Sequence, residues 1–195
     1  VALALASLVA ACFLVSGCSV RSLAVNKIGD ALAETGSNFA SDEDPELVGD
    51  AIPFGLKTME GLLESAPKHR GLLLGTSSGF VQYAYGWVQM EGDMVEAKDL
   101  ARATELRERA RKLYLRARDY GLRGLDVSQP GLPAQLHRDA RSALAGTTRA
   151  DVPLLYWTAA AWAALINLSK DVPQIVAEVP SMQALIDRAA ELDEA

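Results

Sequence analysis

The strongest constraint on the fold is a helical period of apolar residues in the longest regular segment of the chain. Between residues 94 and 120, apolar side chains recur every three or four positions, which places them on one face of an α-helix. The residues that keep this period are Leu100, Ala103, Leu106, Ala110, Leu113, Ala117 and Tyr120. Ala and Leu are abundant in the whole chain, β-branched residues are few, and no segment alternates like a strand. The chain is therefore predicted to be all-α.

Six further helices are expected from similar patterns and from their end signals. They cover approximately residues 20–34, 45–65, 71–90, 134–144, 153–170 and 179–195. Asp44 is a good N-cap for a helix that begins at Pro45, and Pro53 is expected to kink that helix or restart it. The segment 71–90 is apolar nearly all round, so we expect it to be central and buried. Gly121 is expected to end the helix of residues 94–120.

Charge is distributed unevenly in this acidic chain. The net charge of −6 and the pI of about 5.0 argue against nucleic acid as a partner. Arginine nevertheless recurs along one helix, as Arg102, Arg107, Arg109, Arg111, Arg116, Arg118 and Arg123. The pairs Glu105–Arg109 and Glu108–Lys112 have the favourable i,i+4 spacing. A solvated helix face is the favoured interpretation, and a grip on an acidic partner or a ligand carboxylate is the alternative.

The N-terminal segment has the pattern of a lipoprotein leader. Its first 15 residues are apolar apart from Ser7, and no charged residue occurs before Arg21. This run has the length of a signal-peptide core and is shorter than the roughly 20 residues that span a bilayer. It leads into Val15, Ser16, Gly17 and Cys18, which is the residue order of a bacterial lipobox. We therefore expect cleavage before Cys18, a diacylglycerol on its thiol and further acyl chains on its amine.

This interpretation divides the chain into a signal peptide, residues 1–17, and a single helical-repeat domain, residues 18–195. Cys12 is removed with the leader, so the mature protein keeps one cysteine and has no disulfide framework. Ser19 at the second mature position favours the outer membrane in enterobacterial sorting. The chain opens on Val1 without a methionine and stops on a helix without a tail, so we expect the natural protein to continue at both ends.

Two junctions between expected helices resemble tetratricopeptide repeats. In residues 59–86 a helix ends at a proline and the next begins with small residues, and in residues 154–194 a helix rich in Trp and Ala precedes one that ends in "AAELDE". The roughly 34-residue period of such repeats fails between the two junctions, so the repeats are degenerate. Three stretches, residues 39–89, 110–126 and 155–171, resemble the TatT family, the T components of tripartite ATP-independent periplasmic (TRAP) transporters.

This resemblance implies a lipid-anchored periplasmic protein that serves a TRAP uptake system. The expected fold is an all-α array of helix pairs with a pore or cleft open to a ligand. The expected partners are the TRAP periplasmic substrate-binding protein and a small hydrophobic organic molecule, and the expected oligomer is a homotrimer. The family has no catalytic motif to transfer. The alternative is a generic envelope scaffold lipoprotein that binds no small molecule.

Aromatic residues on the two most apolar helices are the candidates for a ligand cleft. They are Phe80, Tyr83, Trp87, Tyr156, Trp157 and Trp162, with Tyr85 as a further aromatic neighbour. Plain core packing against small residues is the favoured interpretation, because repeat helices use large aromatics in this way. The first three share one helix face, whereas Tyr156 and Trp162 point in different directions and cannot line the same cavity.

Other chemistry has weaker support in the sequence. Residues 75–79, "GTSSG", match the G-x-S-x-G nucleophile elbow of esterases, but the elbow needs a strand before it, and here it lies in a helical pattern. His69 and His137 are the only histidines, which leaves little choice of a base for Ser77 or of metal ligands. No nucleotide-binding glycine pattern is present. We therefore expect no enzyme activity, no metal site and no cofactor.

Overall fold

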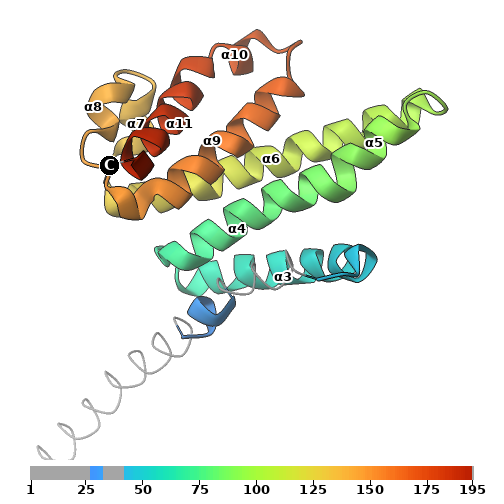
Figure 1. Cartoon of the computed structure of the whole chain (residues 1–195), viewed down its shortest axis with the longest axis horizontal. Coiled ribbons are helices and arrows are strands. Elements are labelled where there is room, and N and C mark those ends of the chain that lie inside the picture. Colours follow the sequence, from blue (N-terminus) through green and yellow to red (C-terminus); the bar gives the residue numbers. More distant parts are fainter. Residues whose placement is uncertain (1–26, 33–41, 195) are drawn as a thin grey trace, which may run out of the picture.

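The described parts of the chain are helical, which confirms the prediction of an all-α fold. The computed structural model describes residues 27–32 and 42–194, and no strand occurs in them (Figure 1). The long helices are α3 (Pro45–Ser65), α4 (Arg70–Tyr83), α6 (Leu100–Ser128), α9 (Val152–Asn167) and α11 (Val179–Glu194). The short ones are η1 (Ala84–Gln89), α5 (Met90–Val95), α7 (Leu132–Leu136), α8 (Ala140–Leu144), η2 (Arg149–Asp151) and α10 (Pro173–Val176). Residues 27–32 are helical within the segment expected over 20–34.

The long helices pack side by side in the order in which they follow along the chain. α6 is central and lies between α4 and α9, while α3 covers the outer side of α4 and α11 covers α9 (Figure 1). η1 and α5 prolong α4 along α6, so that the tip of this hairpin projects beyond the other helices. None of the described helices is both long and apolar enough to cross a membrane. The tetratricopeptide-like geometry of the helix pairs stays a prediction.

Three clusters of buried side chains hold the array together. The largest joins α3, α4, η1, α6 and α9 around Tyr114, which is fully buried. The second surrounds Trp162 of α9, also fully buried, and includes side chains of α7, α8 and α11. A small third cluster of leucines joins α3 to α4. Removal of this apolar surface from water is the main force that fixes the helix order.

Gly121 lies inside α6 and does not end it, so this prediction is wrong. The helix continues to Ser128. Gly121 is buried where α6 meets α9, and a Cβ added to it would overlap the Thr158 side chain. The glycine therefore serves close helix packing and not a turn. The glycine that needs a left-handed backbone is Gly131, with φ of 87°, just before α7.

Pro53 does not restart the helix that contains it, because α3 runs through it from Pro45 to Ser65. A proline inside a helix removes one backbone hydrogen bond. Here Ile52 and Leu56, on either side of it, are buried in the largest cluster. Their packing offsets the lost hydrogen bond and keeps the helix continuous. The predicted N-cap is confirmed, since the Asp44 carboxylate accepts from the Leu47 N–H at 3.0 Å.

Two other expected helices have different limits. The segment expected over 71–90 continues through η1 to Val95, and η1 is a π-helix of six residues. The segment expected over 134–144 is two short helices, because Asp139 forms a new N-cap by accepting from the Ser142 N–H at 3.1 Å. This cap turns the chain so that α7 and α8 pack on each other.

Candidate functional site

The six aromatic candidates lie in three different places. Tyr83 and Trp87 stack on each other, with ring centroids 6.2 Å apart and planes 16° from parallel. Phe80 is buried and stacks on Tyr120 of α6 at 6.2 Å. The remaining three belong to α9, where Tyr156 and Trp157 meet edge to face and Trp162 is fully buried. Among these six candidates, Tyr83 and Trp87 lie together at a pocket lined by described residues.

This pocket, which we call the aromatic recess, lies between the N-terminal end of α3 and the junction of α4 with η1. Its volume is about 440 Å³. Its lining residues are Pro45, Glu46, Gly49, Asp50, Tyr83, Trp87, Glu91 and Arg109. The Trp87 indole donates to the Pro45 carbonyl at 3.1 Å, which ties α3 to η1. The recess thus has an aromatic wall in a fixed position.

Gly49 and Arg109 fix that wall from two sides. A Cβ added to Gly49 would overlap the Trp87 indole, so only glycine lets the ring lie against the α3 backbone. Arg109 donates to the Tyr83 hydroxyl at 3.0 Å, and its guanidinium carbon lies 5.7 Å from the centre of that ring. Both contacts cross between helices, so the spacing along the sequence could not reveal them.

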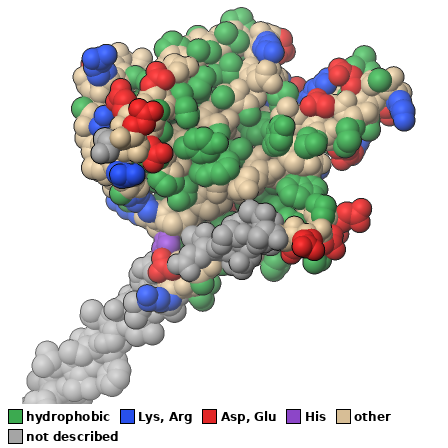
Figure 2. All heavy atoms as spheres, in the orientation of Figure 1, with side chains coloured by type: hydrophobic (Ala, Val, Ile, Leu, Met, Phe, Trp, Pro, Cys, Tyr) green, Lys and Arg blue, Asp and Glu red, His purple; other side chains and the backbone are tan. Residues whose placement is uncertain are grey.

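The rim of the recess is charged. Figure 2 shows acidic side chains gathered at the N-terminal end of α3, to the right. The exposed acidic residues there are Asp42, Glu43, Asp44, Glu46 and Asp50. Arg109 supplies the opposite charge from α6. The recess can therefore hold an organic molecule against the ring faces while its polar groups meet charges of both signs.

The π-helix η1 carries one of the two ring residues of the recess, Trp87. Segments of π-helix occur often at functional sites. Tyr114 donates from the core to the Gln89 side chain at 2.8 Å, so this turn is anchored on α6. Burial raises the pKa of Tyr114 well above its ordinary value, which keeps the phenol neutral. No signal in "AYGWVQ" distinguishes a π-helix from an α-helix.

Trp162 takes part in a packed polar contact and not in the recess. Its indole donates to the Glu178 carboxylate at 2.7 Å, and Arg118 donates to the same oxygen at 3.0 Å. The Arg118 guanidinium also lies over the Trp162 ring, 5.1 Å from its centre. All the polar groups of this contact are paired, as buried polar groups must be.

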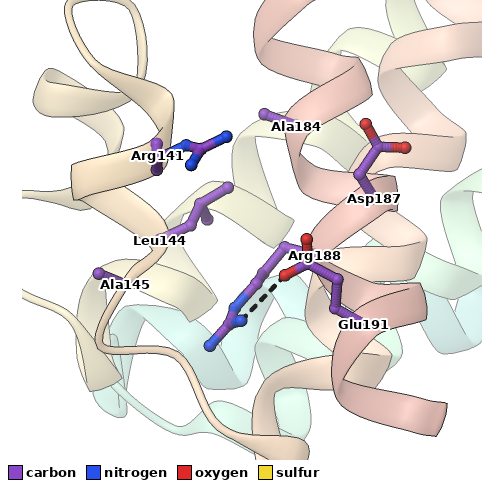
Figure 3. Close-up of a pocket in the computed structure, with 7 residues that line it drawn as sticks. All are labelled: Arg141, Leu144, Ala145, Ala184, Asp187, Arg188 and Glu191. Atoms are coloured by element: carbon purple, nitrogen blue, oxygen red, sulfur yellow. Dashed lines mark hydrogen bonds and ion pairs between the residues drawn. The ribbon is translucent and has the colours of Figure 1, made fainter.

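A second pocket, missed in the sequence, lies between α8 and α11 (Figure 3). It measures about 490 Å³ and is lined by Arg141, Leu144, Ala145, Ala184, Asp187, Arg188 and Glu191. Arg188 is held in place by the Thr147 carbonyl at 3.0 Å and by Glu191 at 3.0 Å. These are ordinary surface residue types with no spacing signal, so sequence analysis could not single them out.

Ser77 is not placed as a nucleophile. It is fully buried inside α4, and its hydroxyl donates to the Ala117 carbonyl at 2.8 Å. A nucleophile elbow requires a serine exposed on a turn between a strand and a helix. Among the described residues, no three His, Cys, Asp or Glu side chains group as metal ligands. The lipobox residues Val15, Ser16, Gly17 and Cys18 lie outside the described residues.

Comparisons with known proteins agree with the resemblance drawn from the sequence. The model of the family described as "TRAP transporter T-component" matches residues 41–195. An uncharacterised protein of Treponema pallidum (strain Nichols) is 28% identical over 201 residues. That alignment covers 94% of this chain and 62% of the relative, so the chain spans less than two thirds of the relative's length.

Proposed function

The chain belongs to the TRAP transporter T-component family, and from this membership we propose that it is a lipid-anchored periplasmic accessory protein of a TRAP-type uptake system. The match to the family model carries the proposal, since it includes every described residue from 42 onward. In this role the protein binds and positions other molecules.

The main partner in this proposal is the periplasmic substrate-binding protein of the same system. A layered array of helices offers broad surfaces made from several elements, which suits a protein partner.

A homotrimer is the proposed oligomer. Stable interfaces between protein subunits bury roughly 1,600 Å² or more. The proposed homotrimer is tested by light scattering of the soluble form that begins at Ser19, which should show three copies; a monomer would contradict it.

A small hydrophobic molecule is the second proposed ligand, and the aromatic recess is where it would bind. There it would lie against the faces of Tyr83 and Trp87, with its polar end toward Arg109. One observation favours the scaffold alternative, in which no such molecule binds. Pockets for apolar ligands are mostly apolar, whereas the recess and the α8–α11 pocket both have several charged lining residues.

Two measurements test the function. A purified TRAP substrate-binding protein from the same organism should form a complex with this protein that survives gel filtration. Native mass spectrometry should detect a co-purified organic molecule that is lost in Tyr83→Ala. The matched control is Tyr156→Ala, which removes an exposed tyrosine outside the recess. If the complex forms and no molecule is found in the wild type, the TRAP role stands without a small ligand; if neither is found, the scaffold alternative is favoured.

A further inference from the structure

Four cations form a row on the exposed face of α6. They are Arg109, Lys112, Arg116 and Arg123, and all four are exposed. Three of them are arginines at seven-residue intervals, which in an α-helix lie nearly in line and about 10.5 Å apart. The row, which we call the α6 basic row, is therefore about 21 Å long and one residue wide.

The cations of the row have fewer acidic partners than the other arginines of α6. Each of the other arginines is paired with an acidic side chain, in the pairs Arg102–Glu91, Arg107–Asp93, Arg107–Glu96, Arg111–Glu108 and Arg118–Glu178. In the row, only Arg116 has a carboxylate partner among the described residues, at 3.5 Å from Glu60. Glu60 also bonds to Lys57 at 2.6 Å and accepts from Tyr120 at 2.9 Å. One shared carboxylate thus faces four cations.

The ion pairs expected from the sequence would have neutralised two members of the row, and they do not form. Glu105 pairs with Arg102 at 3.6 Å, and Glu108 pairs with Arg111 at 2.7 Å. Each of these partners lies three residues from its glutamate, Arg102 before Glu105 and Arg111 after Glu108, and neither belongs to the row. Arg109 and Lys112 consequently keep unneutralised charge in a protein whose net charge is −6.

The three guanidinium groups are already held in position by aromatic rings. Arg109 lies over Tyr83, Arg116 over Phe80 and Arg123 over Tyr120, with guanidinium carbons 5.7, 5.3 and 5.1 Å from the ring centres. Among the described residues, each guanidinium has one polar partner, which is the Tyr83 hydroxyl, Glu60 or the Pro67 carbonyl, and a guanidinium has further N–H groups that can donate to a ligand. The stacking also lowers the side-chain entropy lost when a partner binds.

A shallow hollow of about 390 Å³ lies along the row. Its lining residues are Lys112, Leu115, Arg116, Asp119, Tyr120 and Arg123. The one carboxylate in it, Asp119, is bonded to Arg118 at 3.0 Å. An incoming acidic side chain would therefore meet three cations, and the nearest competing carboxylate is already paired.

We propose that the α6 basic row is the docking surface for an acidic helix of a protein partner, with carboxylates about seven residues apart. A single row with heptad spacing matches the carboxylates along one helix face. A small dicarboxylate could reach only neighbouring cations such as Lys112 and Arg116, whereas a helix can meet the row over its full length of about 21 Å. The net charge of −6 opposes adsorption to an anionic membrane.

This inference names the surface and the partner chemistry of the proposed function, and it rests on that function for the existence of a protein partner. Its test uses two synthetic helical peptides with a fluorescent label. One carries Glu at every seventh position, and the other has the same composition with its Glu residues spread around the helix. The first should bind more tightly, and raising the ionic strength should weaken its binding.

Matched triple variants locate the binding on the row. The row variant combines Arg109→Gln, Lys112→Gln and Arg123→Gln. Its affinity for the peptide with Glu at every seventh position, the heptad peptide, should be about tenfold lower than that of the wild type. The control is Lys98→Gln, Arg138→Gln and Lys170→Gln, which removes the same charge from exposed cations elsewhere and should leave binding unchanged. Equal losses in both triple variants would overturn the proposal, because the effect would then come from net charge alone.

Two further measurements guard against other causes. Lys112 stacks on no aromatic ring of the described residues. The single variant Lys112→Glu should therefore weaken binding of the heptad peptide without lowering the midpoint temperature of unfolding. Two results would overturn the proposal. One is binding of the wild-type protein to vesicles of anionic lipid. The other is an oligomer that dissociates in the row variant while peptide binding stays unchanged. Failure of the TRAP complex to form, with intact peptide binding, would instead contradict the proposed function.

Discussion

At the scale of single residues, the buried carboxylate of Asp151 joins the three inner helices of the array. Asp151 is 2% exposed and accepts from Arg70 at 2.7 Å, from Ser128 at 2.8 Å and from the Thr148 backbone at 2.8 Å. Burial opposes its ionisation, but the bonds from Thr148 and Ser128 and the Arg70 charge outweigh it and hold the pKa below its ordinary value of 3.8. The start of α4, the end of α6 and the start of α9 therefore depend on one charge.

Asp151→Asn should lower the free energy of unfolding at pH 7 by about 2 kcal/mol, because the amide cannot satisfy all of these donors. Because the pKa of Asp151 is lower in the folded protein than its ordinary value of 3.8, the ionised carboxylate contributes its full stabilisation above pH 3.8. This contribution is lost as the pH falls through the pKa of Asp151 in the folded protein. The difference between wild type and variant should therefore shrink toward pH 3 in urea titrations. Asp171→Asn, at an exposed carboxylate, should show no such difference at either pH. A gap that is constant with pH would contradict this role.

At the scale of helices, glycine positions determine how closely α6 approaches its neighbours. A Cβ on Gly121 would overlap Thr158 and would lie 3.1 Å from the Ser77 hydroxyl. Gly121→Ala should therefore destabilise the protein by about 1–2 kcal/mol, although alanine favours the helix. Gly61→Ala in α3 meets nothing within 4 Å and should stabilise it by about 0.5–1 kcal/mol. Thermal unfolding of both variants measures the contrast, and equal signs would contradict the packing role.

Helix content could be predicted from the sequence because it depends on local signals. The cap at Asp44 and the apolar period from Leu100 to Tyr120 both correspond to helices in the structure, whereas the predicted helix start at residue 94 is wrong, because residues 94–95 end α5 and α6 begins at Leu100. Boundaries failed where tertiary packing overrides a local signal. Glycine commonly ends a helix, yet Gly121 stays inside α6, which packs on α9. Proline commonly breaks a helix, yet Pro53 stays inside α3, which packs on α4.

The candidate site was predicted less well than the fold, because it depends on contacts between helices. The sequence indicated that Tyr83 and Trp87 share a face, and they do stack. It could not show that Arg109 of α6 lies on the Tyr83 ring of α4. Distances of this kind are set by the packing of three helices, and the i,i+4 rule for a single helix does not contain them.

At the scale of the whole molecule, the decisive question is whether the helical array is tethered to a membrane. None of the described helices could span a bilayer, and the anchor proposed for this protein is an acyl group on Cys18. A single acyl chain gives only marginal membrane binding, at about 0.8 kcal/mol per buried methylene, whereas two or three chains give a stable anchor. The proposed acylation of Cys18 would supply such an anchor and would leave the α6 basic row free to meet a partner.

Cys18→Ala in a full-length precursor should abolish incorporation of labelled palmitate and release the protein from the membrane fraction. The sequence supplies a matched control, because Cys12 is the only other cysteine and lies within the expected leader. Cys12→Ala should keep both the label and the membrane location. Label that persists in Cys18→Ala would contradict the lipobox. Loss of label with retained membrane location would mean that the uncleaved leader or the array itself holds the protein there, and a form that begins at Ser19 separates these two causes.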